Sequence, residues 1–209
     1  MTSAIKLSLI SGFILLFSQQ LICQKTSYPS GGYATIEDFI QKKINLPDSF
    51  TVRKRSVKNL ENNGGNDYAP ESEVENISKK IKKELFAVSH NDTLYINSGK
   101  LGLQVWYSRV IVEGRYIVFK AAAPSKEFNK QVILAGLLYG TMGTIQAYDH
   151  SATARFTYVL NTSTKEINMF DKKYLEAILE EYPEIKRQFL EDSERKTLEM
   201  LLSYLKLVN

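Results

Sequence analysis

The sequence predicts an α+β domain: an antiparallel sheet of consecutive hairpins, a short helix before it, an apolar glycine-containing helix and a helical tail. Two long runs rich in β-branched and aromatic residues, Leu103–Val112 and Arg115–Ala121, stand on either side of Glu113-Gly114 and indicate a hairpin. After Asp171, apolar residues recur three and four positions apart, as on helices. Residues 33–209 are therefore expected to form one domain, with the tail at 171–209.

The first 23 residues have the order of features that is typical of a secretory signal peptide. Lys6 supplies a positive charge, an apolar run extends from Leu7 to Phe17, and the polar Ser18-Gln19-Gln20 follows. The run is too short to span a bilayer, which requires about 20 apolar residues. The sequence thus predicts export, with removal of residues 1–23.

Cleavage after Cys23 is the preferred processing point, because it leaves a small residue at the end of the signal. Cleavage after Ser18 is the second choice. Lipidation of Cys23 is the third, because Ile22 is not the small residue that normally precedes a lipidated cysteine. Cys23 is the only cysteine, so no intramolecular disulfide can form and the fold depends on its hydrophobic core.

The composition is that of an ordinary globular protein, with 44% hydrophobic and 24% charged residues in a chain of 209. Residues 24–32 mix Thr, Ser, Pro and Gly and indicate a flexible lead-in. The formal net charge is only +4, whereas nucleic-acid binders concentrate basic residues on one face. We therefore expect no nucleic-acid partner.

The first helix is predicted directly after Thr35, which forms a capping-box pattern with Asp38. Ile36, Phe39 and Ile40 give it one apolar face. The residues from 50 to 57 then indicate a strand with a charged face, and residues 62–67 form a strong turn signal because Gly and Asn tolerate positive φ.

Residues 72–83 fit two structures. Ser72 and Glu75 resemble a capping box, and Val74, Ile77 and Ile81 have helical spacing. The lysine-rich end fits the start of the next strand equally well, so both readings stay open.

The next hairpin is expected from residues 85–88 and 93–96, joined by a four-residue loop at 89–92. His90 falls in that loop, which indicates a solvated turn histidine. In the strand that follows, alternation places Val105 and Tyr107 on one face and Trp106 on the other. Aromatic residues in this sheet are interpreted as core or cross-strand pairs.

The uncharged segment 132–147 is the most unusual part of the chain after the signal. Gly136 and Gly140 form a GxxxG step that Gly143 extends, and in a helix each glycine costs about 1 kcal/mol relative to Ala. Close packing against another backbone would offset that cost. A buried core helix is the first interpretation, a membrane or partner contact that includes Leu137 and Leu138 is the second, and a ligand loop is the third.

The tail begins after a hairpin of residues 155–160 and 166–170. Asp171 is expected to cap the first helix of the tail, Pro183 suits the first turn of the second, and Ser193 is expected to cap the third.

No catalytic, metal or cofactor motif stands out. His90 and His150 are the only histidines, they lack HExxH spacing, and the phosphate-binding patterns GxGxxG and GxxxxGK[ST] do not occur. A zinc site requires three or four nitrogen or sulfur ligands. The sequence therefore predicts no metal and no cofactor, and leaves the catalytic residues unknown.

Several short motifs resemble those of a family of exported proteins from Bacteroidetes bacteria, a domain of unknown function. They are Gly31-Gly32-Tyr33, Gly64-Gly65-Asn66-Asp67-Tyr68, the run 92–97, Glu113-Gly114-Arg115-Tyr116 and the strand-plus-helices tail ending in Asn209. The resemblance implies a Gram-negative location in the periplasm, at the outer-membrane periphery or outside the cell. It implies no activity, ligand or catalytic residue.

Three function classes follow. The first is a non-enzymatic binding or structural protein of the cell envelope or secreted fraction. The second is a peripheral membrane-associated protein that uses segment 132–147 on a membrane surface or a protein partner. The third is a hydrolase with a dispersed site near His150.

Overall fold

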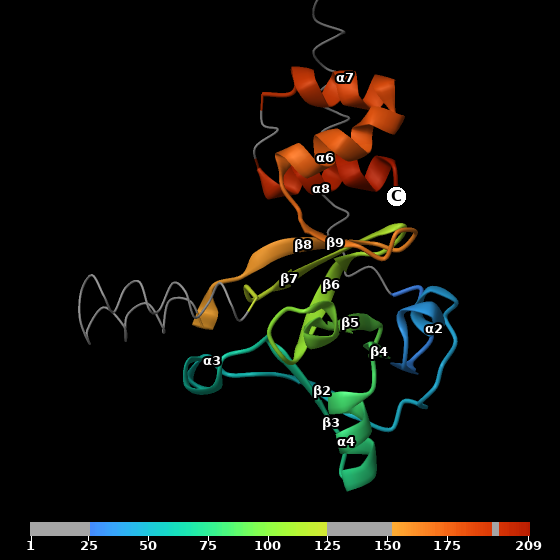
Figure 1. Cartoon of the computed structure of the whole chain (residues 1–209), viewed down its shortest axis with the longest axis vertical. Helices are drawn as coiled ribbons and strands as arrows, with labels where there is room; N and C mark the ends of the chain where they lie inside the picture. Colours follow the sequence, from blue (N-terminus) through green and yellow to red (C-terminus); the bar gives the residue numbers. More distant parts are fainter. Residues whose placement is uncertain (1–25, 125–151, 194–196) are drawn as a thin grey trace, which may run out of the picture.

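The computed structural model describes residues 26–124, 152–193 and 197–209, and its framework is one antiparallel sheet (Figure 1). Seven strands follow the order β1-β4-β5-β6-β7-β8-β9, while β2 pairs with β3 and β3 pairs with β6. The strands are β1 Gly31–Tyr33, β2 Thr51–Lys54, β3 Tyr68–Glu71, β4 Ala87–His90, β5 Thr93–Asn97, β6 Tyr107–Val112, β7 Tyr116–Ala121, β8 Phe156–Asn161 and β9 Ile167–Met169.

Helices interrupt and follow the strands of this sheet, so the predicted α+β class is confirmed. The helices are α2 Ile36–Ile40, α3 Val57–Asn63, α4 Glu75–Lys83, the 3₁₀ turns η1 Ser98–Leu101 and η2 Leu179–Glu181, α6 Lys172–Ile178, α7 Pro183–Glu191 and α8 Leu198–Leu207. None of the helices within the described ranges combines the length and hydropathy needed to cross a membrane.

Strand β7 lies at the centre of the fold and is buried on both faces. Ile117 and Phe119 point into one core, which includes Phe39 and the other N-terminal aromatic residues. Val118 points into a second core, formed with the C-terminal helices around Leu175. Figure 1 shows α6, α7 and α8 gathered at one end of the molecule, while α4 extends at the opposite end.

The predicted hairpins are confirmed, but two of their boundaries are not. The loop between β4 and β5 contains only Asn91 and Asp92, with φ of 47° and 54°. Paired positive φ values define the two-residue turn that suits the twist of a hairpin, so the expected four-residue loop is wrong. Strand β6 begins at Tyr107 rather than Leu103, because a left-handed residue, Trp106 with φ 76°, interrupts the extended backbone.

Three helix starts differ from the sequence analysis. The strand predicted at 50–57 ends at Lys54, because Ser56 accepts a hydrogen bond from the Asn59 amide and caps α3. The open choice at 72–83 resolves to a helix, but α4 begins after Val74 and lacks a side-chain cap. Thr197, not Ser193, caps α8.

The caps at Thr35 and Asp171 are confirmed. The Thr35 side chain accepts from the Asp38 amide, and the Asp171 carboxylate accepts from the Tyr174 amide. Pro183 occupies the first turn of α7, as predicted.

Two terminal segments are tied to the sheet. Before β1, the Tyr28 ring stacks on Phe39 at 4.7 Å between centroids, and the Ser89 hydroxyl donates to the Tyr28 carbonyl. At the other end, the Asn209 side chain accepts from the Tyr116 amide at 2.7 Å and donates to the Glu113 carbonyl at 2.8 Å. Asn209 therefore bridges the turn between β6 and β7.

Candidate functional site

The candidate residues of segment 132–147 (Gly136, Leu137, Leu138, Gly140 and Gly143) and His150 lie outside the described residues. The structure describes the residues on either side of this stretch. The Ala122 amide donates to Asn66 Oδ1 at 2.7 Å, and Arg155 Nη1 donates to the Ala152 carbonyl at 3.0 Å.

His90 ends strand β4, outside the turn that contains Asn91. Its Nδ1 lies 2.8 Å from Asp48 Oδ1, its ring contacts Phe50, and its side chain is only 15% exposed. The interpretation of His90 as a solvated turn histidine is therefore wrong. Within the described ranges, no group of three or more His, Cys, Asp or Glu side chains is placed to hold a metal ion.

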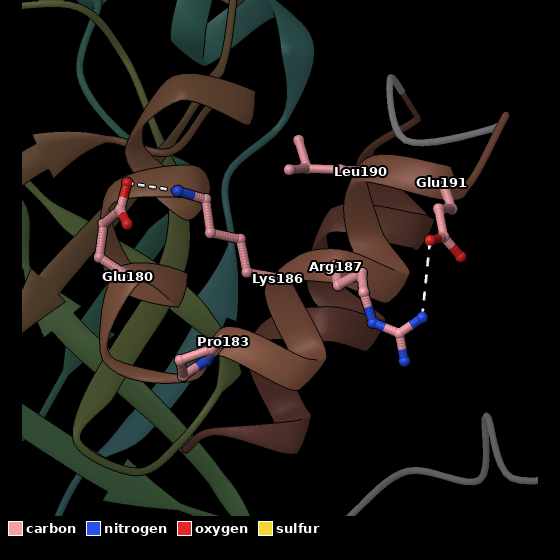
Figure 2. Close-up of a pocket in the computed structure, with 6 residues that line it drawn as sticks. All are labelled: Glu180, Pro183, Lys186, Arg187, Leu190 and Glu191. Carbon is pink, nitrogen blue, oxygen red and sulfur yellow. Dashed lines mark hydrogen bonds and ion pairs between the residues drawn. The ribbon is translucent and has the colours of Figure 1, made fainter.

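One surface hollow, of about 440 Å³, lies along α7 and the turn before it (Figure 2). Its residues are Glu180, Pro183, Lys186, Arg187, Leu190 and Glu191. Figure 2 shows Lys186 paired with Glu180 and Arg187 paired with Glu191. Because these charges compensate one another, the hollow presents no group set aside for a ligand.

The strongest candidate site is built around Trp106, the only tryptophan of the chain. Its φ of 76° is an outlier for a bulky residue, since residues other than Gly, Asn and Asp rarely adopt the left-handed region. Flanking hydrogen bonds fix this backbone: the Ser98 amide donates to the Trp106 carbonyl, and the Asn66 amide donates to the Val105 carbonyl. Strain that the surroundings enforce in this way is concentrated at functional sites in proteins.

Two cations contact the indole ring. The Lys82 Nζ lies 5.4 Å and the Arg55 Cζ 5.3 Å from the ring centroid, within the range of cation–π attraction. Val105, directly before Trp106, is 60% exposed. We name Lys82, Val105 and Trp106 the Trp106 surface.

Arg55 belongs to the layer beneath the Trp106 surface and is only 4% exposed. Its Nη1 donates to the carbonyls of Gly64 and Asn66 at 2.7 and 2.8 Å, and its Nε donates to Asn59 Oδ1 at 2.8 Å. These acceptors are uncharged. Burial lowers the pKa of Arg55, and the nearby positive charge of Arg155 lowers it further.

A second arginine holds the other side of the same turn. Arg155 donates to Asp67 Oδ1 through Nε at 2.9 Å and through Nη2 at 2.7 Å, and also to the Gly65 carbonyl at 3.1 Å. Gln104 completes the layer, because its Oε1 accepts from the Gly65 amide at 2.8 Å. Among the described residues, the Gln104 Nε2 is buried without a hydrogen-bond partner.

Helix α4 brings Lys82 to the ring. Ile81 is its one fully buried residue, and the Tyr107 hydroxyl donates to the Ile81 carbonyl at 2.7 Å, which fixes the helix on the sheet. Lys79 pairs with Glu75 in the same helix. Lys80, Lys82 and Lys83 form no ion pair with any carboxylate in the described part of the chain, although the charge of Lys82 contributes to lowering the pKa of Glu71. Residues 79–84 carry four lysines and one glutamate, so the last turns of α4 are positively charged.

Sequence reasoning missed this site. It marked the 62–67 turn for its shape and placed Trp106 in the sheet, on the face opposite Tyr107. That alternation is wrong, because Trp106 precedes β6 and has a left-handed backbone. The sequence contains two separate hints, a sole tryptophan and a Gly-Gly-Asn turn. Nothing in the sequence indicates that the two lie side by side in the fold.

The fold and the site together define an antiparallel α+β domain with a rigid, cation-flanked tryptophan at one end of its sheet. The chain belongs to a family of unknown function, DUF6563, whose pattern matches residues 31–209. Neither the curated proteins nor the solved structures contain a significant match to it.

Proposed function

We propose that this is an exported, non-catalytic protein of a Gram-negative bacterium of the Bacteroidetes, and that it binds an anionic partner through the Trp106 surface. The observation that carries the proposal is the left-handed backbone of Trp106. Such a conformation costs on the order of 1–3 kcal/mol. A glycine would avoid most of that cost, so the presence of a tryptophan there supports a role for its side chain.

The residue types around the ring agree with a binding role. Tryptophan is enriched among residues that dominate binding energy in interfaces. The exposed Lys82 adds a charge that a carboxylate or phosphate would neutralise. The buried Arg55 and Arg155 hold the turn beneath, so the surface is rigid before a partner arrives.

Export rests on the signal-peptide pattern of residues 1–23. The region matched by the family begins at residue 31, so the expected signal lies outside it. Intact-mass measurement of the protein from the envelope or the medium tests this part. A mature chain that begins at Gln24 is expected, and an uncleaved chain confined to the cytoplasm would contradict it.

Binding can be followed through the intrinsic fluorescence of Trp106, because it is the sole tryptophan. Poly-L-glutamate is expected to shift its emission, with an affinity that falls as salt is raised. Lys82→Glu should abolish the shift. Lys206→Glu, the same change on exposed Lys206 of α8, is the matched control and should leave it intact. Equal responses from both variants would contradict the proposed site.

A second candidate function, peripheral membrane association through segment 132–147, is favoured by its composition. The segment is uncharged over its whole length and rich in Val, Leu and Ile. Vesicle flotation of the wild type and of Leu138→Asp separates the two functions. Loss of flotation in Leu138→Asp with an intact poly-L-glutamate response would support the membrane role of the segment.

A further inference from the structure

We infer that the anionic partner of the Trp106 surface is a lipid bilayer with negatively charged headgroups. This inference rests on the proposed function, because it names the partner of the same surface. Three features support a bilayer: the exposed lysines of α4, the adjacent Val105 and Trp106, and the two arginines that point inward.

A specific carboxylate or phosphate on a protein partner is usually held by the two-pronged guanidinium of an arginine. Here the donors of Arg55 and Arg155 are directed at the turn of residues 64–67 and its neighbours. The last turns of α4 face outward with the ammonium ions of Lys82 and Lys83 beside the carboxylate of Glu84. These ammonium ions act as point charges and suit a diffuse layer of headgroups.

The Trp106 surface also has an apolar part. Tryptophan is enriched at the headgroup level of membranes, where its apolar ring and its N–H group face different surroundings. Val105, adjacent to Trp106 and 60% exposed, supplies an aliphatic group at the same place. An apolar tip beside lysines is the arrangement with which peripheral proteins contact anionic bilayers.

Helix α4 presents its charged side chains at one end of the molecule. Its exposed Lys82 and Lys83 and its half-buried Lys80 lie on sides of the helix that Ile77 and Ile81 do not occupy, and the paired Lys79 and Glu75 share this exposed surface. The helix extends at the end of the molecule opposite α8, so the C-terminal helices do not cover it (Figure 1). A charged helix at this end of the domain can approach a flat surface without obstruction from the C-terminal helices.

The test uses the exported protein with vesicles of phosphatidylglycerol and phosphatidylcholine, and with vesicles of phosphatidylcholine alone. Flotation with the anionic vesicles and a blue shift of Trp106 emission are expected, with little of either on pure phosphatidylcholine. Lys82→Ala and Lys83→Ala should each lower the partition coefficient about fivefold. Val105→Asp should lower it further, and Lys206→Ala should leave it unchanged.

The insertion of Trp106 into the bilayer gives an independent readout, because it can be followed by fluorescence quenching. Lipids brominated along the acyl chain should quench Trp106 when the protein is bound, and Lys82→Ala should restore the emission in proportion to its lost flotation. All of these side chains except Trp106 are exposed, so the variants are expected to keep the wild-type denaturation midpoint. This separates lost binding from lost folding.

The outcomes distinguish this inference from the proposed function. A response to poly-L-glutamate without binding to anionic vesicles would overturn the bilayer as partner, leave the anionic site intact, and point to an acidic protein or polysaccharide. The absence of both responses would overturn the site itself. Equal flotation on both vesicle types, unchanged by Lys82→Ala, would also overturn the inference.

Discussion

Gly65 lies against the edge of the Trp106 ring: a methyl group on Gly65 would stand 2.8 Å from Trp106 Cδ1. The same methyl group would lie 3.0 Å from the Val105 carbonyl oxygen and 3.1 Å from Arg55 Nη1. Gly65 also has a φ of 83°, which side-chain-bearing residues rarely adopt. The turn therefore requires glycine here for both its conformation and its contacts.

Gly65→Ala should lower the free energy of unfolding and disturb the environment of Trp106. Gly102→Ala is a matched control, because Gly102 has a similar φ of 76° but a methyl group added to it would meet nothing within 4 Å. The control should cost about 1–2 kcal/mol from backbone strain alone. Gly65→Ala should cost more and shift the tryptophan emission in denaturant titrations. Equal losses in the two variants would mean that the contact with Trp106 carries no energy.

Arg55→Lys should be strongly destabilising although it keeps the charge. A lysine cannot reproduce the bonds to Asn59, Gly64 and Asn66 at once, and hydrogen bonds to charged groups contribute about 1.5–3 kcal/mol each. We expect a loss of about 2–4 kcal/mol in urea unfolding. Arg53→Lys is the control: this exposed arginine pairs with Glu71 at the surface, and its loss should stay below about 1 kcal/mol. Similar values for both would contradict a special role for Arg55.

Asn209→Ala should loosen the hairpin of β6 and β7. The change removes the bonds from Asn209 Nδ2 to the Glu113 and Tyr116 carbonyls and the bond that Oδ1 accepts from the Tyr116 amide. A loss of about 1–3 kcal/mol is expected. Asn209→Asp keeps the acceptor and removes the donors, so it should fall between the wild type and Asn209→Ala. Faster hydrogen exchange at the Tyr116 amide would locate the effect.

Stability should fall at alkaline pH because of the tyrosines near the N-terminus. Burial, with a smaller effect of the Glu113 charge, raises the pKa values of Tyr28 and Tyr33 from 10.0 to about 12. A group whose pKa is higher in the folded state stabilises the fold below its unfolded pKa, and the stabilisation is lost as the pH rises through the folded pKa. The free energy of unfolding should therefore decrease between about pH 10 and 12.

Tyr28→Phe and Tyr33→Phe together should make this alkaline decrease shallower. The decrease should not vanish, because burial also raises the pKa of Tyr107. Urea unfolding at a series of pH values measures the slope, and tyrosinate absorbance follows the ionisation. An identical slope in the wild type and the double variant would show that these two hydroxyl groups do not contribute.

Features encoded over a few residues could be predicted from the sequence. The Asp171 cap, the first turn at Pro183 and the hairpin around Gly114 depend on neighbours within four positions, and each of them is present. Helix α3 was not predicted, because its only signal is the Ser56 cap within a run of basic residues, and that run also fits a strand.

The candidate site could not be predicted, because its parts are distant in sequence. Arg155 and Gly65 are 90 residues apart, and Gln104 and Gly65 are 39 apart. The left-handed backbone of Trp106 results from hydrogen bonds on both sides of it rather than from its own preference. Local propensity therefore predicts an ordinary strand there, and the three-dimensional fold overrides it.

The pairing order of the strands also bears on how the protein reaches its folded state. Strands β4, β5 and β6 each pair with the next strand in sequence across short loops. Strand β7 pairs with β8 across the long connection between Ala121 and Phe156, and β3 likewise pairs with β6 across a long stretch of chain. Longer loops cost more entropy to close, and contacts distant in sequence slow folding. Tyr68 and Tyr107 form that long-range pair, directly beside Trp106. The Trp106 surface is thus expected to assemble late in folding, and tryptophan emission would report the last slow step rather than the first collapse.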